Sequence, residues 1–221
     1  MAGLDDLAPA ERAKLLGKPD GEAGLALAEW MNDFNRPFIE ASRNCLTLEN
    51  RHRLLEIGFG NGHHVTDLLA RAQALEYVGV DISATMVEEA ARFNDLLVAT
   101  GQARFQLGSV EALPFAPASF DRAIAINVIY FWPEPVRPLT EIRRVLCPDG
   151  ISVIGASDPS SQKAAYAREE YGFHPREAAT LVALHREAGF RHVEVETAEH
   201  TVTALDGTRL SRRFNIVIAH P

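Results

Sequence analysis

The stretch Leu54-Leu55-Glu56-Ile57-Gly58-Phe59-Gly60-Asn61-Gly62 decides the fold of this chain. It joins an apolar run, which is typical of a buried strand, to a loop with glycine at every second position. Glycine adopts positive φ and carries no Cβ, so a ligand can approach the backbone of this loop closely. A second apolar run, Tyr77-Val78-Gly79-Val80, is followed by Asp81, whose carboxylate can accept hydrogen bonds from a ribose. The pattern indicates a nucleoside-binding site at the ends of two strands.

Apolar strands and amphipathic helices alternate outward from this stretch. We expect strands at 54–57, 77–80, 103–107, 122–128, 151–156, 192–196 and 215–219. We expect helices at 64–73, 84–99, 136–146 and 175–189, with a turn at Pro148-Asp149-Gly150. This alternation predicts an α/β fold, a three-layer αβα sandwich whose seven-stranded sheet is mostly parallel. Because no clear helix separates the final two strands, the last strand is expected to run antiparallel.

The chain is predicted to form a single domain, in which a helical cover segment at 1–50 precedes the main body at 51–221. Helical spacing of apolar residues occurs at 22–34 and 38–48, and both helices are expected to cover a site at the strand ends. Residues 1 to about 20 are polar and interrupted by proline and glycine, so this stretch is expected to be mobile.

The composition predicts a soluble globular protein without a nucleic-acid partner. The 221 residues are 47% apolar, and the formal net charge of −8 repels phosphate backbones. Three arginines come nearest to a basic patch, and they are interpreted as the solvated edge of a strand: Arg209, Arg212 and Arg213. The two cysteines imply no disulfide framework, the acidic N-terminus is unlike a signal peptide, and no apolar run could span a membrane. These features predict a cytoplasmic location.

The glycine spacing separates two classes of nucleoside cofactor. Dinucleotide-binding loops follow G-x-G-x-x-G and hold a pyrophosphate at a helix N-terminus. Here the spacing is G-x-G-x-G, and His63 takes the place of the third dinucleotide glycine. Glu56 would repel a pyrophosphate but would attract a ligand that carries an ammonium and a sulfonium. An NAD(P)-dependent Rossmann oxidoreductase is therefore the alternative rather than the first hypothesis.

Five motifs follow one another between residue 50 and about residue 160. They are Glu56–Gly62, Val80–Ser83, Gly108–Phe115, Ser119–Asp121 with the strand after it, and Glu141–Leu146 with the turn after it. In these motifs the chain resembles the class I S-adenosylmethionine-dependent methyltransferases, and most of all the small-molecule branch that includes the ubiquinone and menaquinone biosynthesis enzymes. The resemblance implies a Rossmann-like fold and an enzyme that transfers a methyl group to a small-molecule acceptor by in-line displacement at the sulfonium. A non-catalytic S-adenosylmethionine-binding protein is a second alternative.

The resemblance also implies which residues bind the cofactor. In order from the methionine part through the ribose and adenine to the sulfonium side, they are Glu56, Gly58, Gly60, Gly62, Asp81, Ile82, Ser109, Val110, Glu111 and Asn127. Ser109 stands where the family often has an acid, so the adenine amine could bind either Ser109 or Glu111. The run Asn127-Val128-Ile129-Tyr130 lacks the paired prolines of members that methylate amide or nucleobase nitrogens, which disfavours those acceptors.

No residue of the sequence stands out as a general base. Methyl transfer from a sulfonium needs mainly alignment and a dry site, and a base only where the nucleophile must lose a proton. The candidates are Tyr130, His174 and His63; alternatively, Tyr130 lies in the core or lines the pocket and the histidines flank helix starts. The aromatic run 130–132 suits an apolar or planar acceptor, or else packs against the cover helices. No metal is expected, because the neighbouring His63 and His64 would not share a helix face.

Overall fold

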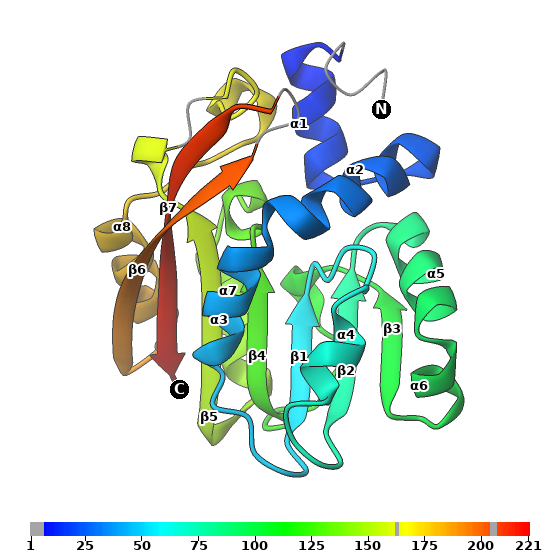
Figure 1. Cartoon of the computed structure of the whole chain (residues 1–221). Helices are drawn as coiled ribbons and strands as arrows, with labels where there is room; N and C mark the ends of the chain where they lie inside the picture. Colours follow the sequence, from blue (N-terminus) through cyan, green and yellow to red (C-terminus); the bar gives the residue numbers. More distant parts are fainter. Residues whose placement is uncertain (1–6, 162–163, 204–206) are drawn as a thin grey trace.

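Seven strands form one mixed sheet in the computed structural model of the chain, which describes residues 7–161, 164–203 and 207–221 (Figure 1). The strands are β1 Arg53–Ile57, β2 Glu76–Asp81, β3 Ala103–Leu107, β4 Phe120–Ile126, β5 Leu146–Ser157, β6 His192–Thr203 and β7 Arg209–His220. Their order is β3-β2-β1-β4-β5-β7-β6; β1 to β5 are parallel, and β7 runs antiparallel to β5 and β6. The predicted sheet, mostly parallel with an antiparallel last strand, is confirmed.

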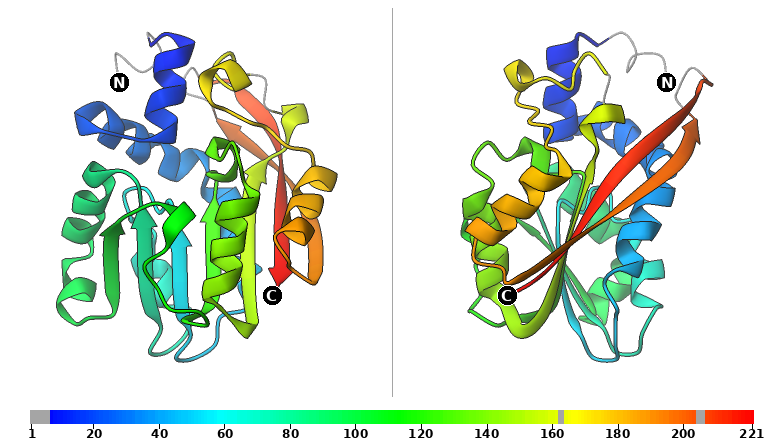
Figure 2. Two further views of the ribbon diagram at one scale, coloured as in Figure 1. Left: turned by 180° about the vertical axis from the view of Figure 1, so that it is seen from behind. Right: turned by 90° about the vertical axis from the view of Figure 1, so that its left-hand side faces the viewer.

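Helices cover both faces of this sheet (Figure 2). They are α1 Pro9–Gly17, α2 Gly21–Phe34, α3 Arg36–Asn44, α4 Val65–Leu69, α5 Ala84–Phe93, α6 Asp95–Ala99, α7 Val136–Val145 and α8 Ala178–Glu187, with 3-10 helices η1 Val110–Ala112, η2 Ile129–Phe131, η3 Pro159–Ser161 and η4 Glu169–Tyr171. The helices α3 and α4 pack on one face and α7 and α8 on the other. The helix α2 runs across the carboxyl end of the sheet, and α1 stands above it (Figure 1).

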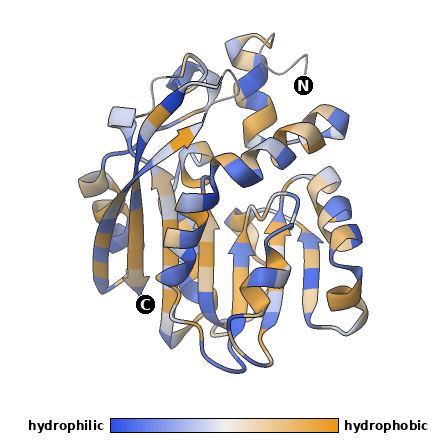
Figure 3. Cartoon of the chain, in the orientation of Figure 1, coloured by the Kyte–Doolittle hydropathy of each residue, from blue (hydrophilic) through white to orange (hydrophobic). Residues whose placement is uncertain are grey.

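The strands are apolar on both sides because both faces of the sheet are covered. Leu54 packs on the side of α3 and α4, whereas its neighbour Leu55 packs on the side of α7 and α8. The covering helices carry hydrophilic residues beside the hydrophobic ones, as half-exposed helices do (Figure 3). On the first face, Phe38 of α3 stacks on Phe214 of β7 with ring centroids 4.0 Å apart, which ties the N-terminal helices to the last strand.

The helix expected at 84–99 is two helices, α5 and α6. Asn94 lies between them with φ −108° and ψ 35°, outside the helical region. Its side-chain amide donates to the carbonyl of Gly62 at 3.0 Å, so a contact with the glycine loop ends α5 early. The helices expected at 64–73 and 175–189 are also shorter in the structure, where they are α4 and α8.

The turn expected at 148–150 lies inside β5. Leu146 pairs with Phe120 and Ile151 pairs with Arg122, so the residues between them bulge out of the ladder. A proline cannot donate a ladder hydrogen bond and is tolerated at a bulge, which accounts for this local departure from the sequence pattern.

Residues 9–17 form α1, although the sequence predicts a mobile stretch there. Pro9 stands in the first turn, where its missing N–H costs no hydrogen bond, and Glu11 accepts a hydrogen bond from the backbone N–H of Ala8 at 3.1 Å. Across the described residues, none of the helices is both long and apolar enough to cross a membrane.

Candidate functional site

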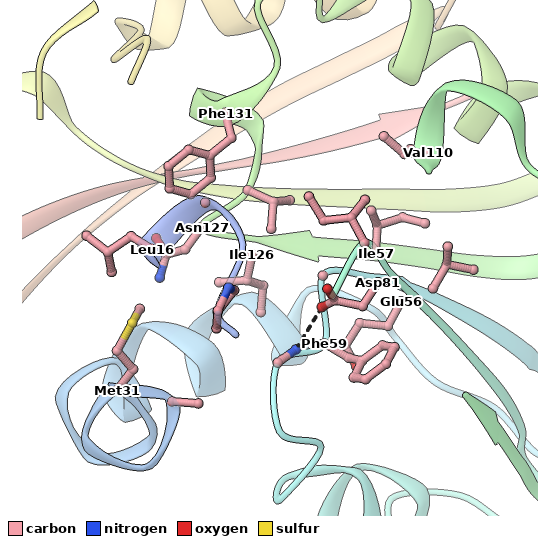
Figure 4. Close-up of a pocket in the computed structure, with 18 of the residues that line it drawn as sticks. Leu16, Met31, Glu56, Ile57, Phe59, Asp81, Val110, Ile126, Asn127 and Phe131 are labelled. Atoms are coloured by element: carbon pink, nitrogen blue, oxygen red, sulfur yellow. Dashed lines mark hydrogen bonds between the residues drawn. The ribbon is translucent and has the colours of Figure 1, made fainter. Parts of the chain in front are cut away.

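A cavity of about 300 Å³ lies at the carboxyl ends of β1, β2 and β4, beneath α1 and α2 (Figure 4). The strand order reverses here, since β2 and β4 flank β1, and open α/β sheets bind ligands at such a position. All the predicted cofactor residues except Gly62 line the cavity: Glu56, Gly58, Gly60, Asp81, Ile82, Ser109, Val110, Glu111 and Asn127. The fold thus brings four separate segments of the chain to one place.

The three glycines after β1 serve different purposes. Gly58 and Gly60 have φ of +70° and +62°, a conformation that glycine adopts without strain. A Cβ on Gly58 would lie 2.4 Å from Cγ1 of Val128, whereas a Cβ on Gly60 would meet no atom within 4 Å. A Cβ on Gly62 would lie 2.7 Å from Cβ of Ala90 in α5. Gly60 therefore presents bare backbone to the cavity, and Gly62 allows α5 to pack closely on the loop.

Asp81, at the end of β2, joins this loop to the loop after β2. One carboxylate oxygen accepts a hydrogen bond from the backbone N–H of Gly60 at 3.4 Å, and the other accepts one from Ser83 at 2.8 Å. The side chain faces the cavity on the same side as Phe59, with Leu16 and Met31 across from it (Figure 4). Burial raises the pKa of Asp81 to about 6, and hydrogen bonds from backbone N–H groups, those of Ser83 and Gly60 among them, oppose this rise.

Glu56 is a cavity-lining acid held by a buried network. Its Oε2 lies 2.8 Å from Nε2 of His64 and accepts a hydrogen bond from the hydroxyl of Tyr77 at 2.8 Å. Burial alone would raise the pKa of Glu56, but the charges of His64 and Arg43 and these hydrogen bonds outweigh it, and the pKa is lowered. Glu56 is therefore an anion at neutral pH, on the wall nearest the glycine loop.

The wall formed by η1 combines polar and apolar groups. The hydroxyl oxygen of Ser109 accepts a hydrogen bond from the backbone N–H of Glu111 at 3.2 Å, which begins η1. The carboxylate of Glu111 lies 3.6 Å from Arg137, in a largely exposed ion pair. Ile82, beside this wall, is 46% exposed. An apolar ring system lying on it would remove that surface from water.

Asn127, just after β4, has two unusual features. Its φ is +59°, a strained conformation for a residue with a side chain, and its backbone N–H donates to the carbonyl of Gly155 at 2.9 Å. Its Oδ1 is buried and has no hydrogen-bond partner among the residues that the structure describes. A buried acceptor without a donor is costly, so a ligand with an N–H or O–H group would be stabilised there.

Comparison with known proteins identifies the family. Residues 55–154 match the model of the methyltransferase domain, a range that contains the glycine loop, Asp81, η1 and Asn127. The chain is 25% identical over 153 residues to the uncharacterized methyltransferase YdaC of Bacillus subtilis. The aligned region makes up 69% of this chain and 79% of that protein.

The chain carries a methyltransferase domain of the class I, S-adenosylmethionine-dependent kind. It is also 26% identical over 145 residues to the rice protein 2-methyl-6-phytyl-1,4-hydroquinone methyltransferase 2, covering 65% of this chain and 40% of that protein. The same fold occurs in a solved structure, the complex between the Haloferax volcanii Trm112 methyltransferase activator and a methyltransferase. One chain of that complex superposes with a TM-score of 0.73 and is 19% identical. The match covers 88% of this chain and 92% of that one. Apart from YdaC, the chain spans only 38% to 55% of the first curated relatives.

Sequence reasoning expected N-terminal helices over the methyltransferase cavity but named none of their lining residues and did not predict α1. The cavity-lining residues that it did not name include Leu16, Gly17, Leu27, Met31, Asn32 and Asn35. The sequence does contain a signal for α1, namely a proline at the first helical position followed two residues later by an acid. That signal predicts a helix but does not predict where the helix lies. Its place depends on a contact with a distant residue: a Cβ on Gly17 would lie only 3.2 Å from the ring of Phe131.

None of the three candidate bases lines this cavity. The ring of His63 stacks on Phe93 at 3.8 Å and its Nδ1 lies 3.3 Å from the amide nitrogen of Asn32. The ring of Tyr130 stacks on Phe173 at 4.2 Å, and the backbone N–H of His174 donates to the carbonyl of Tyr130 at 2.7 Å. Within the described part of the chain, no three His, Cys, Asp or Glu side chains gather as a metal site would require.

Proposed function

We propose that the protein transfers a methyl group from S-adenosylmethionine to a small-molecule acceptor. The methyltransferase domain supports the reaction, and the name of the rice relative, a hydroquinone methyltransferase, supports an acceptor of small size. The absence of paired prolines after Asn127 agrees with an acceptor that is neither an amide nor a nucleobase nitrogen.

The observation that carries the proposal is the charge of the cavity. Its described lining contains three acids, Glu56, Asp81 and Glu111, and neither lysine nor arginine. The basic groups beside these acids are already paired, His64 with Glu56 and Arg137 with Glu111, so a dinucleotide would place its pyrophosphate against carboxylates without a free cation in the described lining. A ligand with an ammonium and a sulfonium would instead be attracted. The acidic lining thus argues against the NAD(P)-dependent oxidoreductase alternative.

The lining also suits the separate parts of S-adenosylmethionine. We assign the backbone at Gly60 and the anion of Glu56 to the methionine part, and the carboxylate of Asp81 to the ribose hydroxyls. We assign Ile82 to one face of the adenine, with Ser109, Val110 and Glu111 at its edge. The partnerless Oδ1 of Asn127 would accept a hydrogen bond from a donor on the sulfonium side.

When bound, S-adenosylmethionine supplies a methyl group that is activated by the sulfonium. The residues of this chain contribute alignment and exclusion of water, because α1 and α2 place Leu16, Leu27 and Met31 over the cavity. We propose residues 1–50 as the cover of the site, and the cytoplasmic location stays a prediction. We assign no catalytic base, since the candidates from the sequence lie outside the cavity lining and His64 is engaged by Glu56.

The test is a pair of equilibrium titrations followed by a turnover assay. We expect calorimetry to detect binding of S-adenosylhomocysteine and none of NADH. We then expect label to move from S-adenosylmethionine with a radioactive methyl group to at least one member of a panel of phenols, aryl acids, thiols and amines. Binding of NADH alone would support the oxidoreductase. Binding of S-adenosylhomocysteine without any transfer would support the non-catalytic alternative.

A further inference from the structure

A side chamber of about 40 Å³ adjoins the main cavity. The two spaces share part of their lining, namely Leu16, Met31, Asn35, Asn127 and Phe131. The chamber lies on the side of η2 and β7, away from the walls that carry Asp81 and Ser109. It is large enough for a group of a few atoms but not for a whole organic molecule. An organic ligand with one group in the chamber would extend into the main cavity beside Asn127, which lines both spaces.

The chamber is lined mainly by aromatic side chains, which are Trp30, Phe34, Tyr130, Phe131, Tyr166 and Phe173. They are packed against one another: the rings of Tyr130 and Phe173 are stacked at 4.2 Å, and those of Trp30 and Phe34 at 4.5 Å. Flat apolar walls of this kind favour a planar ligand, because stacked and edge-on ring contacts add to the burial of apolar surface.

Arg212 brings a cation to these aromatic walls. Its guanidinium lies 5.1 Å from the ring centroids of both Phe34 and Phe214 and donates a hydrogen bond to the hydroxyl of Ser157 at 2.6 Å. The interpretation of Arg212 as part of a solvated strand edge is therefore wrong, because β7 turns this side chain inward between α2 and β5, while its neighbour Arg213 is exposed. Burial lowers the pKa of Arg212, because the charged guanidinium is partly removed from water.

A second donor faces the same space. Tyr130 lines the chamber and is only 7% exposed, and its hydroxyl is a hydrogen-bond donor. Burial raises the pKa of Tyr130, so the group is a neutral hydroxyl at physiological pH and can donate. A guanidinium and a hydroxyl together suit a carboxylate, which accepts charge-assisted hydrogen bonds through both oxygens.

The geometry points to this chamber as the binding site for the anionic group of a planar aromatic methyl acceptor, held by Arg212 and Tyr130. This inference rests on the proposed function and adds the class of acceptor. The carboxylate lies in the chamber, and the ring extends from it past Phe131 and Asn127, which line both spaces, into the main cavity. The competing occupant is the carboxylate of the cofactor itself, and the test below separates the two.

The first arm of the test uses the unaltered protein and two matched probes. We saturate the protein with S-adenosylhomocysteine and titrate it with 4-hydroxybenzoate and, separately, with its neutral isostere 4-hydroxybenzamide. We expect the benzoate to bind at least about 10-fold more tightly, since only it offers a charge to the guanidinium. Equal affinities for the two probes would overturn the inference and leave the proposed function intact. The same holds if neither probe binds to protein that does bind S-adenosylhomocysteine. Failure to bind S-adenosylhomocysteine would instead overturn the proposed function.

The second arm uses matched variants of neighbouring arginines. We expect Arg212→Gln to remove the preference for the benzoate and to change the affinity for S-adenosylhomocysteine by less than about 2-fold. The control Arg213→Gln removes the same charge from an exposed position and should keep the preference. A loss of S-adenosylhomocysteine affinity comparable to the loss of benzoate affinity would assign Arg212 to the cofactor and overturn the inference. If Arg212→Gln does not fold, Tyr130→Phe, which keeps the ring stack, should still weaken benzoate binding several-fold more than benzamide binding.

Discussion

Replacement of Asp81 by asparagine should make the unliganded protein more stable and the cofactor complex weaker. Burial raises the pKa of Asp81 to about 6 from an ordinary value of 3.8. In the unfolded chain the carboxyl loses its proton near pH 4, whereas in the folded protein it does so near pH 6. The buried charge therefore costs nothing below pH 4, costs more as the pH rises towards 6, and reaches a constant cost above that.

The size of this cost follows from the shift of roughly two pKa units, which corresponds to roughly 3 kcal/mol of folding free energy. Asparagine keeps an oxygen that can accept from the backbone N–H of Ser83, but its amide nitrogen cannot accept from Gly60. The loss of that long hydrogen bond offsets part of the gain. We expect Asp81→Asn to be more stable than the unaltered protein by about 1–2 kcal/mol at pH 7 and by much less at pH 4.

The assay is urea unfolding of both proteins at several pH values between 4 and 7.5, with S-adenosylhomocysteine titrations on the same samples. A ribose hydroxyl donates better to a charged carboxylate than to an amide, so we expect affinity at pH 7.5 to fall by about 1–2 kcal/mol in the variant. Affinity in the unaltered protein should rise as the pH passes 6, and that rise should vanish in the variant. A stability difference that is the same at every pH would refute the reasoning about burial. Unchanged affinity in a folded variant would refute the assignment to the ribose.

The remaining predictions concern the loop and the network beneath it. Gly60→Ala should lower the affinity for S-adenosylhomocysteine at least about 10-fold in calorimetry, because its methyl group enters the cavity, while the left-handed φ costs about 1–2 kcal/mol of stability. Gly62→Ala should cost about 2–4 kcal/mol in urea unfolding, since its Cβ would lie 2.7 Å from that of Ala90; equal stability of the two alanine variants would contradict the packing argument. Tyr77→Phe should cost about 1–3 kcal/mol, because buried Glu56 loses a hydroxyl donor, and an unchanged urea midpoint would show that water replaces it.

The central part of the fold was predictable from the sequence because local patterns determine it. The apolar run before Gly58 and the run before Asp81 each fix a strand and the position of its end, and parallel strands bring those ends to one edge of the sheet. Most residues predicted at the site line the cavity for this reason. Gly62 is different, since the close approach of α5 rather than the cavity requires its missing side chain.

The rest depends on contacts between distant segments, which no local pattern reveals. Asn94 ends α5 through a hydrogen bond to the glycine loop, and Pro148 lies in a bulge that the pairing of β4 and β5 creates. The side chain of Arg212 is enclosed because Phe34 of α2 lies over this part of β7. In each case the residue type allows the observed structure, but the three-dimensional neighbour selects it.

The stacking of Phe38 on Phe214 has a consequence for biosynthesis. The helices that roof the cavity are translated first, but the strand to which α3 is fastened is translated nearly last. Until β7 has joined the sheet, α3 lacks the ring of Phe214 on which Phe38 packs. We therefore expect the roof of the cavity to reach its final packing only after the last strand has been synthesised.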